Sequence, residues 1–457
     1  MKRNPARWRH YAIAICLISV VTFAWADDDV DEELEQSMTA ETEREDDDDA
    51  FERAERDVER SFEDQFEDAE ELEDELEERL ERMFEAKGHR GEDFDDEFIT
   101  QGIEDNIHQL WQLEEMLDES GFPALPEQTI ALLTEQELND AEASGADIIA
   151  TEVMTELGGI LVTFGDSRVV PPKESDNNHL YGLDGATMPS SISTPVPTLA
   201  KMMGISAPIS LPVKIGLMDS HIQEDHPCLT GVHINQAAYY PPEATNDDVH
   251  GTAMASILTG RADCAAPGIL AQAELDNAVV FARTDHGLVV ATAADLVAGL
   301  NWLLAQQVNV INLSLSGPPN RVLEEALNRV HDRGVIIVAS AGNDGPVAFP
   351  RYPAAYSSVI AVTAIDAALN IYSRACQGDH IAFAAPGVGV RVADASTGRD
   401  QAMDGTSVAA VFVAAALALE QSEGADKVER MEVQAKDLGA LGKDVIFGYG
   451  LPQVHLP

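Results

Sequence analysis

Three short stretches determine how this chain is interpreted: Leu217-Met218-Asp219-Ser220, His250-Gly251-Thr252-Ala253-Met254-Ala255 and Gly405-Thr406-Ser407-Val408-Ala409-Ala410. They put an aspartate at the end of a strand-like run, and a histidine and a serine each at the start of a helix-like run. A serine hydroxyl is a poor nucleophile until a neighbouring base takes its proton, and that base needs a third group to hold its tautomer. The order Asp, His, Ser therefore predicts a hydrolase that forms an acyl-enzyme.

The sequence around these stretches alternates between strand and helix patterns. Apolar strands are expected over 213–218, 278–281, 308–315, 335–339 and 359–362, and helices over 250–258, 293–306, 322–333 and 406–421. Strands that are apolar throughout and alternate with helices indicate a parallel sheet covered on both faces. Functional sites in such sheets lie beyond the carboxyl ends of the strands, and Asp219 follows directly on such a strand.

Each candidate residue also has an ordinary explanation. Asp219 with Ser220 suits a turn or a helix cap, and His250 is one of 12 histidines. Ser407 suits a simple N-cap. A fourth candidate, Asn343, follows the strand at 335–339 and suits a donor to developing negative charge, but Asn-Asp-Gly is also a common turn. Only the combination of the four points to catalysis.

Together the four sites resemble the subtilisin-like serine peptidases, the subtilases, over about residues 212–451. An Asp strand, a His-Gly-Thr helix, an Asn loop and a Gly-Thr-Ser helix occur in that family in this order. The resemblance implies an α/β fold of three layers with a mostly parallel central sheet. It also implies that Asp219 orients the base, that His250 is general base and then acid, and that Ser407 attacks. Asn343 would donate to the oxyanion together with the backbone N–H of Ser407.

The resemblance extends to substrate binding. Ser314, Leu315, Ser316 and Gly317 lie in a stretch that resembles the strand with which the family pairs an extended substrate, a case of strand addition to a sheet edge. Asp344 lies near the place where relatives form their first specificity pocket. An acidic group there would favour a basic side chain, although an exposed turn aspartate is the plainer alternative.

Five segments are expected along the chain: a signal peptide at 1–26, an acidic low-complexity and helical segment at 27–121, a small α+β unit at 122–169, a linker at 170–212 and the peptidase domain at 213–457. A basic start, an apolar run too short to span a membrane and the Ala24-Trp25-Ala26 cleavage motif indicate the signal. An uncleaved N-terminal anchor is the alternative. We therefore expect a secreted or periplasmic protein without an integral membrane span.

The acidic segment is expected to be partly disordered and partly helical. Apolar residues spaced by four and seven positions predict a helix over 51–84, whereas the preceding stretch has almost nothing apolar to bury. The formal net charge of the chain is -52. Such a charge repels DNA, RNA and anionic membranes, so a nucleic-acid partner is excluded.

The unit at 122–169 reads as strand, helix, strand, strand. Strands are expected over 128–133, 148–153 and 160–164, and a helix over 134–143 with Thr134 as its N-cap and Gln136 or Glu137 in its first turn. In position and element order this unit resembles the prodomains of subtilases. That resemblance implies a zymogen, cut somewhere within 170–212, whose own prodomain is an intramolecular inhibitor.

Three cysteines would remain after signal removal: Cys228, Cys264 and Cys376. In an oxidising compartment two of them can pair and one is left over. Many subtilases carry a calcium-binding aspartate in the place of Cys228, and the resemblance implies a Cys228–Cys264 disulfide there instead, with two unpaired thiols as the alternative. Cys376 is expected to be a buried free thiol. No cofactor is expected for catalysis; calcium binding is left open as an alternative, with no site identified for it.

The sequence thus predicts a serine endopeptidase that acts on protein or peptide substrates. The alternative is a binding or scaffold protein on a catalytically retired peptidase fold. Covalent labelling of the serine discriminates between the two.

Overall fold

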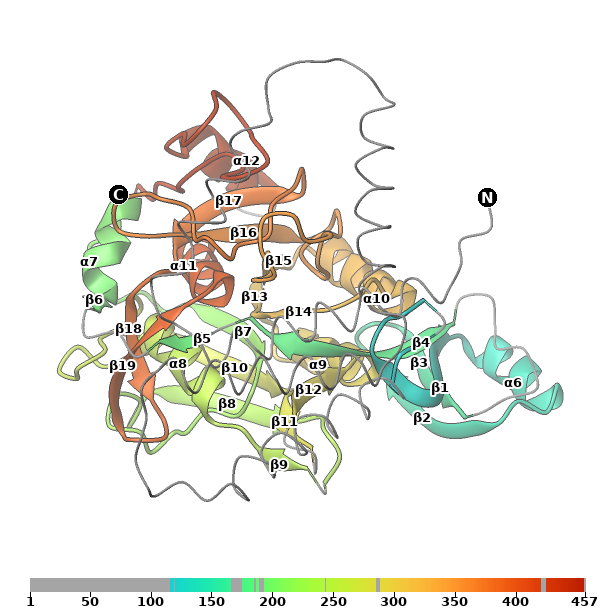
Figure 1. Cartoon of the computed structure of the whole chain (residues 1–457). Coiled ribbons are helices and arrows are strands. Elements are labelled where there is room, and N and C mark those ends of the chain that lie inside the picture. The colour runs from blue at the N-terminus through green and yellow to red at the C-terminus, as the bar shows by residue number, and fades with distance from the viewer. Residues whose placement is uncertain are drawn as a thin grey trace, which may run out of the picture. The chain divides into compact units, whose positions relative to one another are not determined.

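The computed structural model describes residues 116–118, 120–165, 175–184, 186–188, 193–242, 244–284, 288–420 and 425–455. These residues all belong to one compact unit (Figure 1). The signal peptide expected at 1–26 and the helix expected over 51–84 lie outside the described residues, as does nearly all of the acidic segment. Among the described helices, none is both long and apolar enough to cross a membrane.

The centre of the fold is a seven-stranded sheet in the order β17-β16-β15-β13-β7-β10-β8. Its strands are β7 (Lys214–Asp219), β8 (His233–Ala238), β10 (Glu274–Val279), β13 (Val310–Leu313), β15 (Ile336–Ser340), β16 (Ile360–Ile365) and β17 (Ile381–Pro386). Every neighbouring pair in this sheet is parallel. The predicted parallel sheet is confirmed, with β8 and β17 added to the strands that the sequence indicated.

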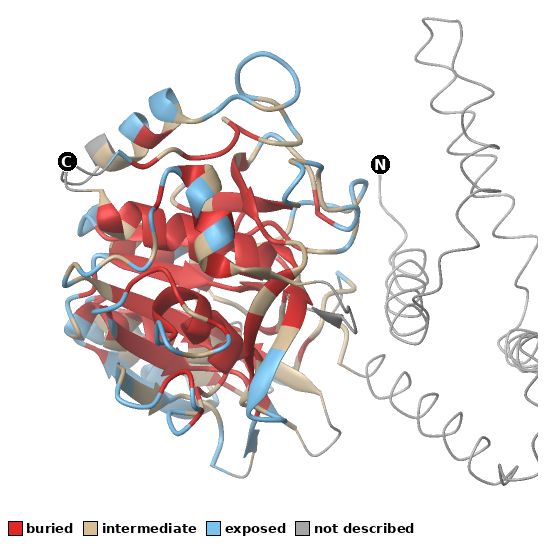
Figure 2. Ribbon diagram, turned by 90° about the vertical axis from the view of Figure 1, so that its left-hand side faces the viewer, coloured by how far each residue is buried: buried red, intermediate tan, exposed pale blue. Residues whose placement is uncertain are grey.

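Helices cover both faces of this sheet. One core contains α8 (Val249–Thr259) and α11 (Thr406–Leu419), and the other contains α9 (Ala293–Ala305) and α10 (Arg321–Asp332). Leu217 belongs to the first core and Met218 to the second, because successive side chains of a strand point to opposite faces. Figure 2 shows the sheet and the helices against it as mostly buried. The three-layer α/β architecture is therefore as predicted.

The small unit near the start of the described chain contains β1 (Ala124–Leu133), α6 (Glu135–Ala143), β2 (Ile148–Met154) and β3 (Gly159–Phe164). Thr134 and Glu137 form a reciprocal capping box at the start of α6, as the sequence indicated. The unit lies on the outer helices α9 and α10. Asn301 of α9 accepts hydrogen bonds from the backbone of Glu156 and Leu157 at 2.9 and 3.2 Å, and Arg333 pairs with Glu156 at 3.3 Å.

The stretch expected to be a linker, 170–212, differs from the prediction because it holds regular structure. It contains β4 (Asp176–Leu183), β5 (Ala186–Met188), β6 (Thr194–Pro195), α7 (Val196–Ala200) and the short helix η1 (Lys201–Met203). Strand β4 runs antiparallel to β1, to β12 (Val289–Thr292) and to β14 (Leu315–Ser316). One strand therefore joins the sheet of the small unit to the edge strands of the peptidase domain.

The described residues include several shorter elements as well. Strands β18 (Val390–Asp394) and β19 (Arg399–Asp404) form a four-stranded sheet with β5 and β6. A further sheet contains β1 to β4 and β12, and the two-residue strands β11 (Ala282–Arg283) and β9 (Thr245–Asn246) extend it beyond β12. Helix α12 (Ala425–Gln434) lies near the C-terminus. Asp404 at the end of β19 pairs with Ala186 of β5, two positions before α11 begins at Thr406.

Candidate active site

Asp219 and His250 form a buried pair at the carboxyl end of the central sheet. Asp219 ends β7 with none of its surface exposed, and His250 lies in the first turn of α8. The Nδ1–H of His250 donates to Oδ1 of Asp219 at 2.8 Å, and the backbone N–H of Ser220 donates to the same oxygen at 2.7 Å. The carboxylate therefore fixes the tautomer that leaves Nε2 of His250 as the basic nitrogen.

The glycine after His250 allows this close approach. A Cβ atom on Gly251 would lie 2.3 Å from the carbonyl oxygen of Ser220. In the absence of a side chain, the backbone N–H of Gly251 reaches the hydroxyl of Ser220 at 2.9 Å. The end of β7 and the start of α8 are thus held together directly, and this contact brings the aspartate to the histidine.

The electrostatics of His250 suit a general base. Burial alone would lower the pKa of His250, but the charge of Asp219 and the hydrogen bond to it raise the pKa above its usual value. Nε2 of His250 is buried and has no hydrogen-bond partner among the described residues. A buried basic nitrogen without a partner is available to accept a proton.

Ser407 is the second residue of α11, two positions after the N-cap Gly405. Gly405 has φ 148°, a conformation that residues with a side chain rarely adopt. Nearly every residue of α11 is buried, so the helix is held from all sides and its first turn is fixed. The first N–H groups of a helix lack partners within the helix, and they favour negative charge nearby.

The hydroxyl of Ser407 donates to the backbone carbonyl oxygen of Asp184, and the backbone N–H of Ser407 donates to the same oxygen at 3.2 Å. A second acceptor for the hydroxyl is the carbonyl of Ser314 at 3.4 Å. The structure thus brings Asp219 and His250 into contact, whereas Ser407 contacts Asp184 rather than the imidazole. Sequence reasoning did not find Asp184.

Asn343 lies beside the same helix start. Its Oδ1 accepts hydrogen bonds from the backbone N–H and the hydroxyl of Thr406, at 3.1 and 3.0 Å. A backbone N–H can only donate, so the atom that faces it must be the amide oxygen. The amide nitrogen of Asn343 is consequently the group left to donate elsewhere.

The stretch expected to bind substrate forms strand β14 and its flanks. Leu315 and Ser316 pair antiparallel with Leu183 and Gly182 of β4, and the N–H of Asp184 donates to the carbonyl of Ser314 at 3.3 Å. Gly317 leaves room for the ring of Tyr181, because a Cβ atom at this position would lie 2.4 Å from that ring. A segment of the chain itself therefore lies along this edge.

Comparison with known proteins matches residues 212–450 to the model of the subtilase family. This chain belongs to the subtilase family. The match covers the parallel sheet and all four predicted catalytic positions, so the resemblance expected from the sequence is confirmed.

Relatives of this subtilase include the minor extracellular protease Epr of Bacillus subtilis (strain 168), 32% identical over 53% of this chain and 38% of Epr. Subtilisin DY of Bacillus licheniformis is 32% identical over 45% of this chain and 76% of that protein. The chain thus spans less than half of Epr. Among solved structures, fervidolysin from Fervidobacterium pennivorans, described as a keratinolytic enzyme related to subtilisin, aligns with a TM-score of 0.59 over 72% of this chain and 60% of fervidolysin, at 17% identity.

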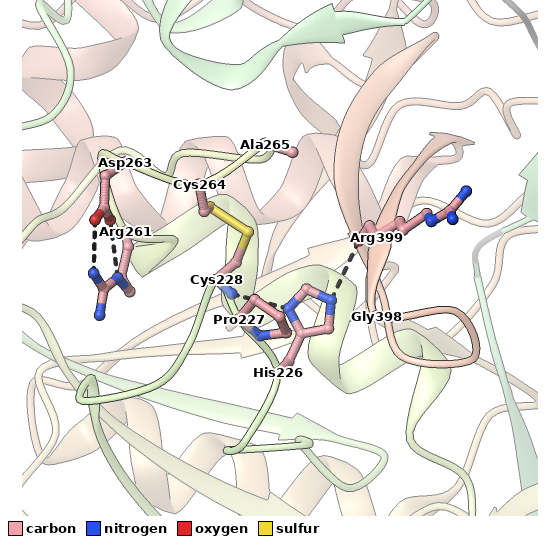
Figure 3. Close-up of a pocket in the computed structure, with 9 residues that line it drawn as sticks. All are labelled: His226, Pro227, Cys228, Arg261, Asp263, Cys264, Ala265, Gly398 and Arg399. Carbon is pink, nitrogen blue, oxygen red and sulfur yellow. Dashed lines mark hydrogen bonds and ion pairs between the residues drawn. A yellow bond between two sulfur atoms is a disulfide. The ribbon is translucent and has the colours of Figure 1, made fainter.

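A disulfide joins Cys228 and Cys264, with Cα atoms 5.2 Å apart, while Cys376 is a buried free thiol. Both cysteine predictions for this subtilase are confirmed. The disulfide borders a surface pocket lined by His226, Pro227, Cys228, Arg261, Asp263, Cys264, Ala265, Gly398 and Arg399 (Figure 3). Arg261 is paired with Asp263 there at 2.7 Å. No group of three His, Cys, Asp or Glu side chains in the described part of the chain could hold a metal ion.

The disulfide ties the loop after β7 to the loop after the C-terminal end of α8. We expect replacement of both Cys228 and Cys264 by serine to lower the free energy of unfolding by about 3 to 4 kcal/mol, because a closed loop of 36 residues restricts the unfolded chain. Urea denaturation in a Ser407→Ala background, which prevents self-digestion, measures this difference. Equal unfolding midpoints with and without the cysteines would contradict it.

The expectation that Asp344 favours a basic side chain of the substrate is not supported by its surroundings. Its carboxylate is paired with Arg351 at 2.5 Å. The side chain that faces this region is instead that of Asp184, whose carboxylate accepts from the hydroxyls of Ser316 and Ser340.

Proposed function

We propose that this subtilase is a serine endopeptidase that is exported and made as a zymogen. Ser407 is its nucleophile and His250 is its general base and acid. Asp219 orients the base and stabilises its protonated form. Its substrates are peptide bonds in extended segments, and its own small unit at 122–169 is its intramolecular inhibitor.

The main support for this proposal is the position of Asp184. Its carbonyl oxygen accepts hydrogen bonds from Ser407, and the chain before and after it is paired in β-strands, as an extended substrate would be. Strand β4 precedes Asp184 and pairs with β12 and β14. Strand β5 follows it and pairs with β19, which leads into Gly405 and Ser407. Backbone pairing on both sides of one carbonyl is the arrangement of an extended peptide before cleavage.

The chemistry follows from the donors present. The hydroxyl of Ser407 turns toward Nε2 of His250, gives up its proton and attacks the carbonyl carbon. The oxyanion is stabilised by the N–H of Ser407, which already contacts this oxygen, and by the amide nitrogen of Asn343. His250 then protonates the leaving amine, and water hydrolyses the acyl-enzyme. No metal or cofactor enters a step, although calcium is common in the family.

The small unit supports the zymogen proposal because it is attached to the strand that fills the site. Strand β4 pairs with β1 of the unit, and Arg329 of α10 donates to the carbonyls of Leu157 and Gly158 at 3.3 and 2.5 Å. While β4 is paired with β14, no other peptide can pair with that edge of β14. Cleavage after Asp184 would break the covalent link between the unit and the peptidase domain and leave the unit bound by these non-covalent contacts.

A fluorophosphonate probe tests the proposal. The full chain is expected to be labelled slowly while the small unit is bound and rapidly after processing, because the same strand blocks the nucleophile. Mass spectrometry should map the label to the peptide that contains Ser407. A processed, folded chain that takes no label would overturn the peptidase proposal and favour the retired scaffold.

Replacement of Asn343 by alanine is expected to lower kcat by about 10²- to 10³-fold with little change in KM, the loss known for an oxyanion-hole asparagine in subtilisin itself. Steady-state peptide hydrolysis, normalised to labelled enzyme, measures it. Asn370→Ala is the matched control, since Asn370 is exposed and hydrogen-bonded only within its own turn. A fall in both variants alike would remove Asn343 from this role.

A further inference from the structure

We propose that Ser316 and Ser340 form a pocket that selects aspartate immediately before the scissile bond, so that this subtilase is an aspartate-directed peptidase and first cuts its own chain after Asp184. We call the two serines the acyl-side pocket. The inference rests on the proposed function and adds the substrate class to it.

The side chain of Asp184 is held by the peptidase domain and not by its own strand. Oδ1 of Asp184 accepts from the hydroxyl of Ser316 in β14 at 2.7 Å. Oδ2 accepts from the hydroxyl of Ser340 at the end of β15 at 2.8 Å. Asp184 is 6% exposed. A buried carboxylate is tolerated only where its oxygens are hydrogen-bonded, and each oxygen here has its own donor.

The pocket suits both protonation states of an aspartate. Burial raises the pKa of Asp184 to about 6, and the two serine hydroxyls oppose that rise. The hydroxyl of Ser340 also has the carbonyls of Leu313 and Leu315 within 3.5 and 3.4 Å. It can donate to one of these carbonyls while it accepts a hydrogen bond from the O–H of a neutral carboxyl group, because a hydroxyl both donates and accepts.

The charged neighbours leave the two hydroxyls as the principal ligands. The guanidinium of Arg351 forms its salt bridge with Asp344 and not with the carboxylate of Asp184. The other titratable groups that face Asp184 are His250 and the thiol of Cys376. The carboxylate of Asp344 raises the pKa of Asp184, and the charge of Arg351, with which Asp344 is paired, opposes that rise. A lysine or arginine in place of Asp184 would leave both serine hydroxyls without an acid to bind, so the pocket favours a short acid over a basic side chain.

A second contact extends the recognition to the residue three positions earlier. Tyr181 is 1% exposed, and its hydroxyl donates to the carbonyl of Pro318 at 3.0 Å. Gly317 makes room for its ring. A peptide substrate that tests the proposal should therefore contain the segment Tyr181-Gly182-Leu183-Asp184.

The test uses processed enzyme and peptides of residues 178–188 that carry Asp, Asn, Glu, Ala or Lys at the position of Asp184. We expect kcat/KM for the Asp peptide to exceed that for the Ala peptide by about 10- to 100-fold, the effect of hydrogen bonds to a charged group. The Glu peptide should be cut more slowly than the Asp peptide, because an extra methylene displaces the carboxylate from both serines. The Lys peptide should be cut slowest.

Pocket variants attribute this preference to the two serines. Ser340→Ala and Ser316→Ala should each reduce the Asp-to-Ala ratio by about 3- to 10-fold, because each removes one of the two hydrogen bonds to the carboxylate. Ser357→Ala, at an exposed turn, should leave the ratio as in the wild type. The ratio is taken within one preparation, so a partly misfolded fraction cancels. An unchanged ratio in both pocket variants would overturn the inference.

The self-cleavage arm uses the Ser407→Ala full chain as a substrate for wild-type enzyme. Edman sequencing should find a new N-terminus at Gly185, and Asp184→Lys in the same chain should abolish that cut. Enzyme that takes the fluorophosphonate but cuts after other residues overturns only the aspartate preference. Enzyme that neither takes the label nor cuts any peptide overturns the proposed function itself.

Discussion

Replacing Ser407 by alanine is expected to lower kcat by about 10⁶-fold, the effect known for the nucleophile of subtilisin, and to leave the chain unprocessed. The hydroxyl that would attack is lost, while the N–H of residue 407 still faces the carbonyl of Asp184. A residual rate of roughly 10³- to 10⁴-fold over water is expected from binding and the oxyanion site alone. Intact mass over time and peptide turnover measure the two effects.

The fold should survive this change, because alanine favours helices and residue 407 is buried within α11. Circular dichroism and the thermal midpoint check this point. Ser357→Ala, exposed and distant in sequence, is the matched control and should process as the wild type does. Processing of the Ser407→Ala chain at the wild-type rate, in the absence of other peptidases, is the outcome that would contradict the role of Ser407.

Replacing Asp219 by asparagine is expected to lower kcat/KM by about 10⁴-fold. The N–H of Ser220 can only donate, so the amide oxygen should take the place of Oδ1 and keep the hydrogen bond to His250. The loss is then mainly electrostatic, because the negative charge that stabilises the imidazolium is gone. The amide nitrogen would occupy the place of Oδ2, which has no partner, at a cost of about 1 to 3 kcal/mol in stability.

This variant also has a pH signature. A general base must be neutral to accept a proton, so a raised pKa of His250 puts the acid limb of the wild-type kcat/KM profile above the usual 6.5. Removal of the charge of Asp219 takes away the main cause of the rise, and the limb should move to lower pH. A limb that stays in place while the rate falls would show that Asp219 does not set the charge of the base.

Asp276→Asn is the matched control for Asp219→Asn. Asp276 is also a buried strand aspartate, 2% exposed, but it pairs with Lys214 at 3.2 Å and accepts from Asn235 at 2.7 Å. Its replacement should lower stability and leave the pH limb unmoved. The comparison separates loss of a buried carboxylate from loss of the partner of His250.

The sequence by itself determined five of the seven strands of the central sheet, the helices α8, α9, α10 and α11 against it, and the chemical type of each candidate catalytic residue. Strands such as β7 and β13 are continuous apolar runs, α11 is apolar on every side, and Thr134 with Glu137 marks a helix start. These signals are local, because burial and capping act on residues close together in the chain. For the same reason the cysteine pair could be inferred only from resemblance to a family, since its partners are 36 residues apart.

Only the tertiary structure decided which peptide lies at the nucleophile. The hydrogen bond between Ser407 and Asp184 joins residues 223 apart, and β4 lies in a stretch whose prolines, glycines and serines indicate a linker. Backbone pairing with β1, β12 and β14 holds β4 together with contacts such as that of Tyr181 to Pro318, and the backbone hydrogen bonds require no particular side chains. Such pairing leaves no pattern in the sequence, so the position of Asp184 between Ser316 and Ser340 emerges only when the chain is folded.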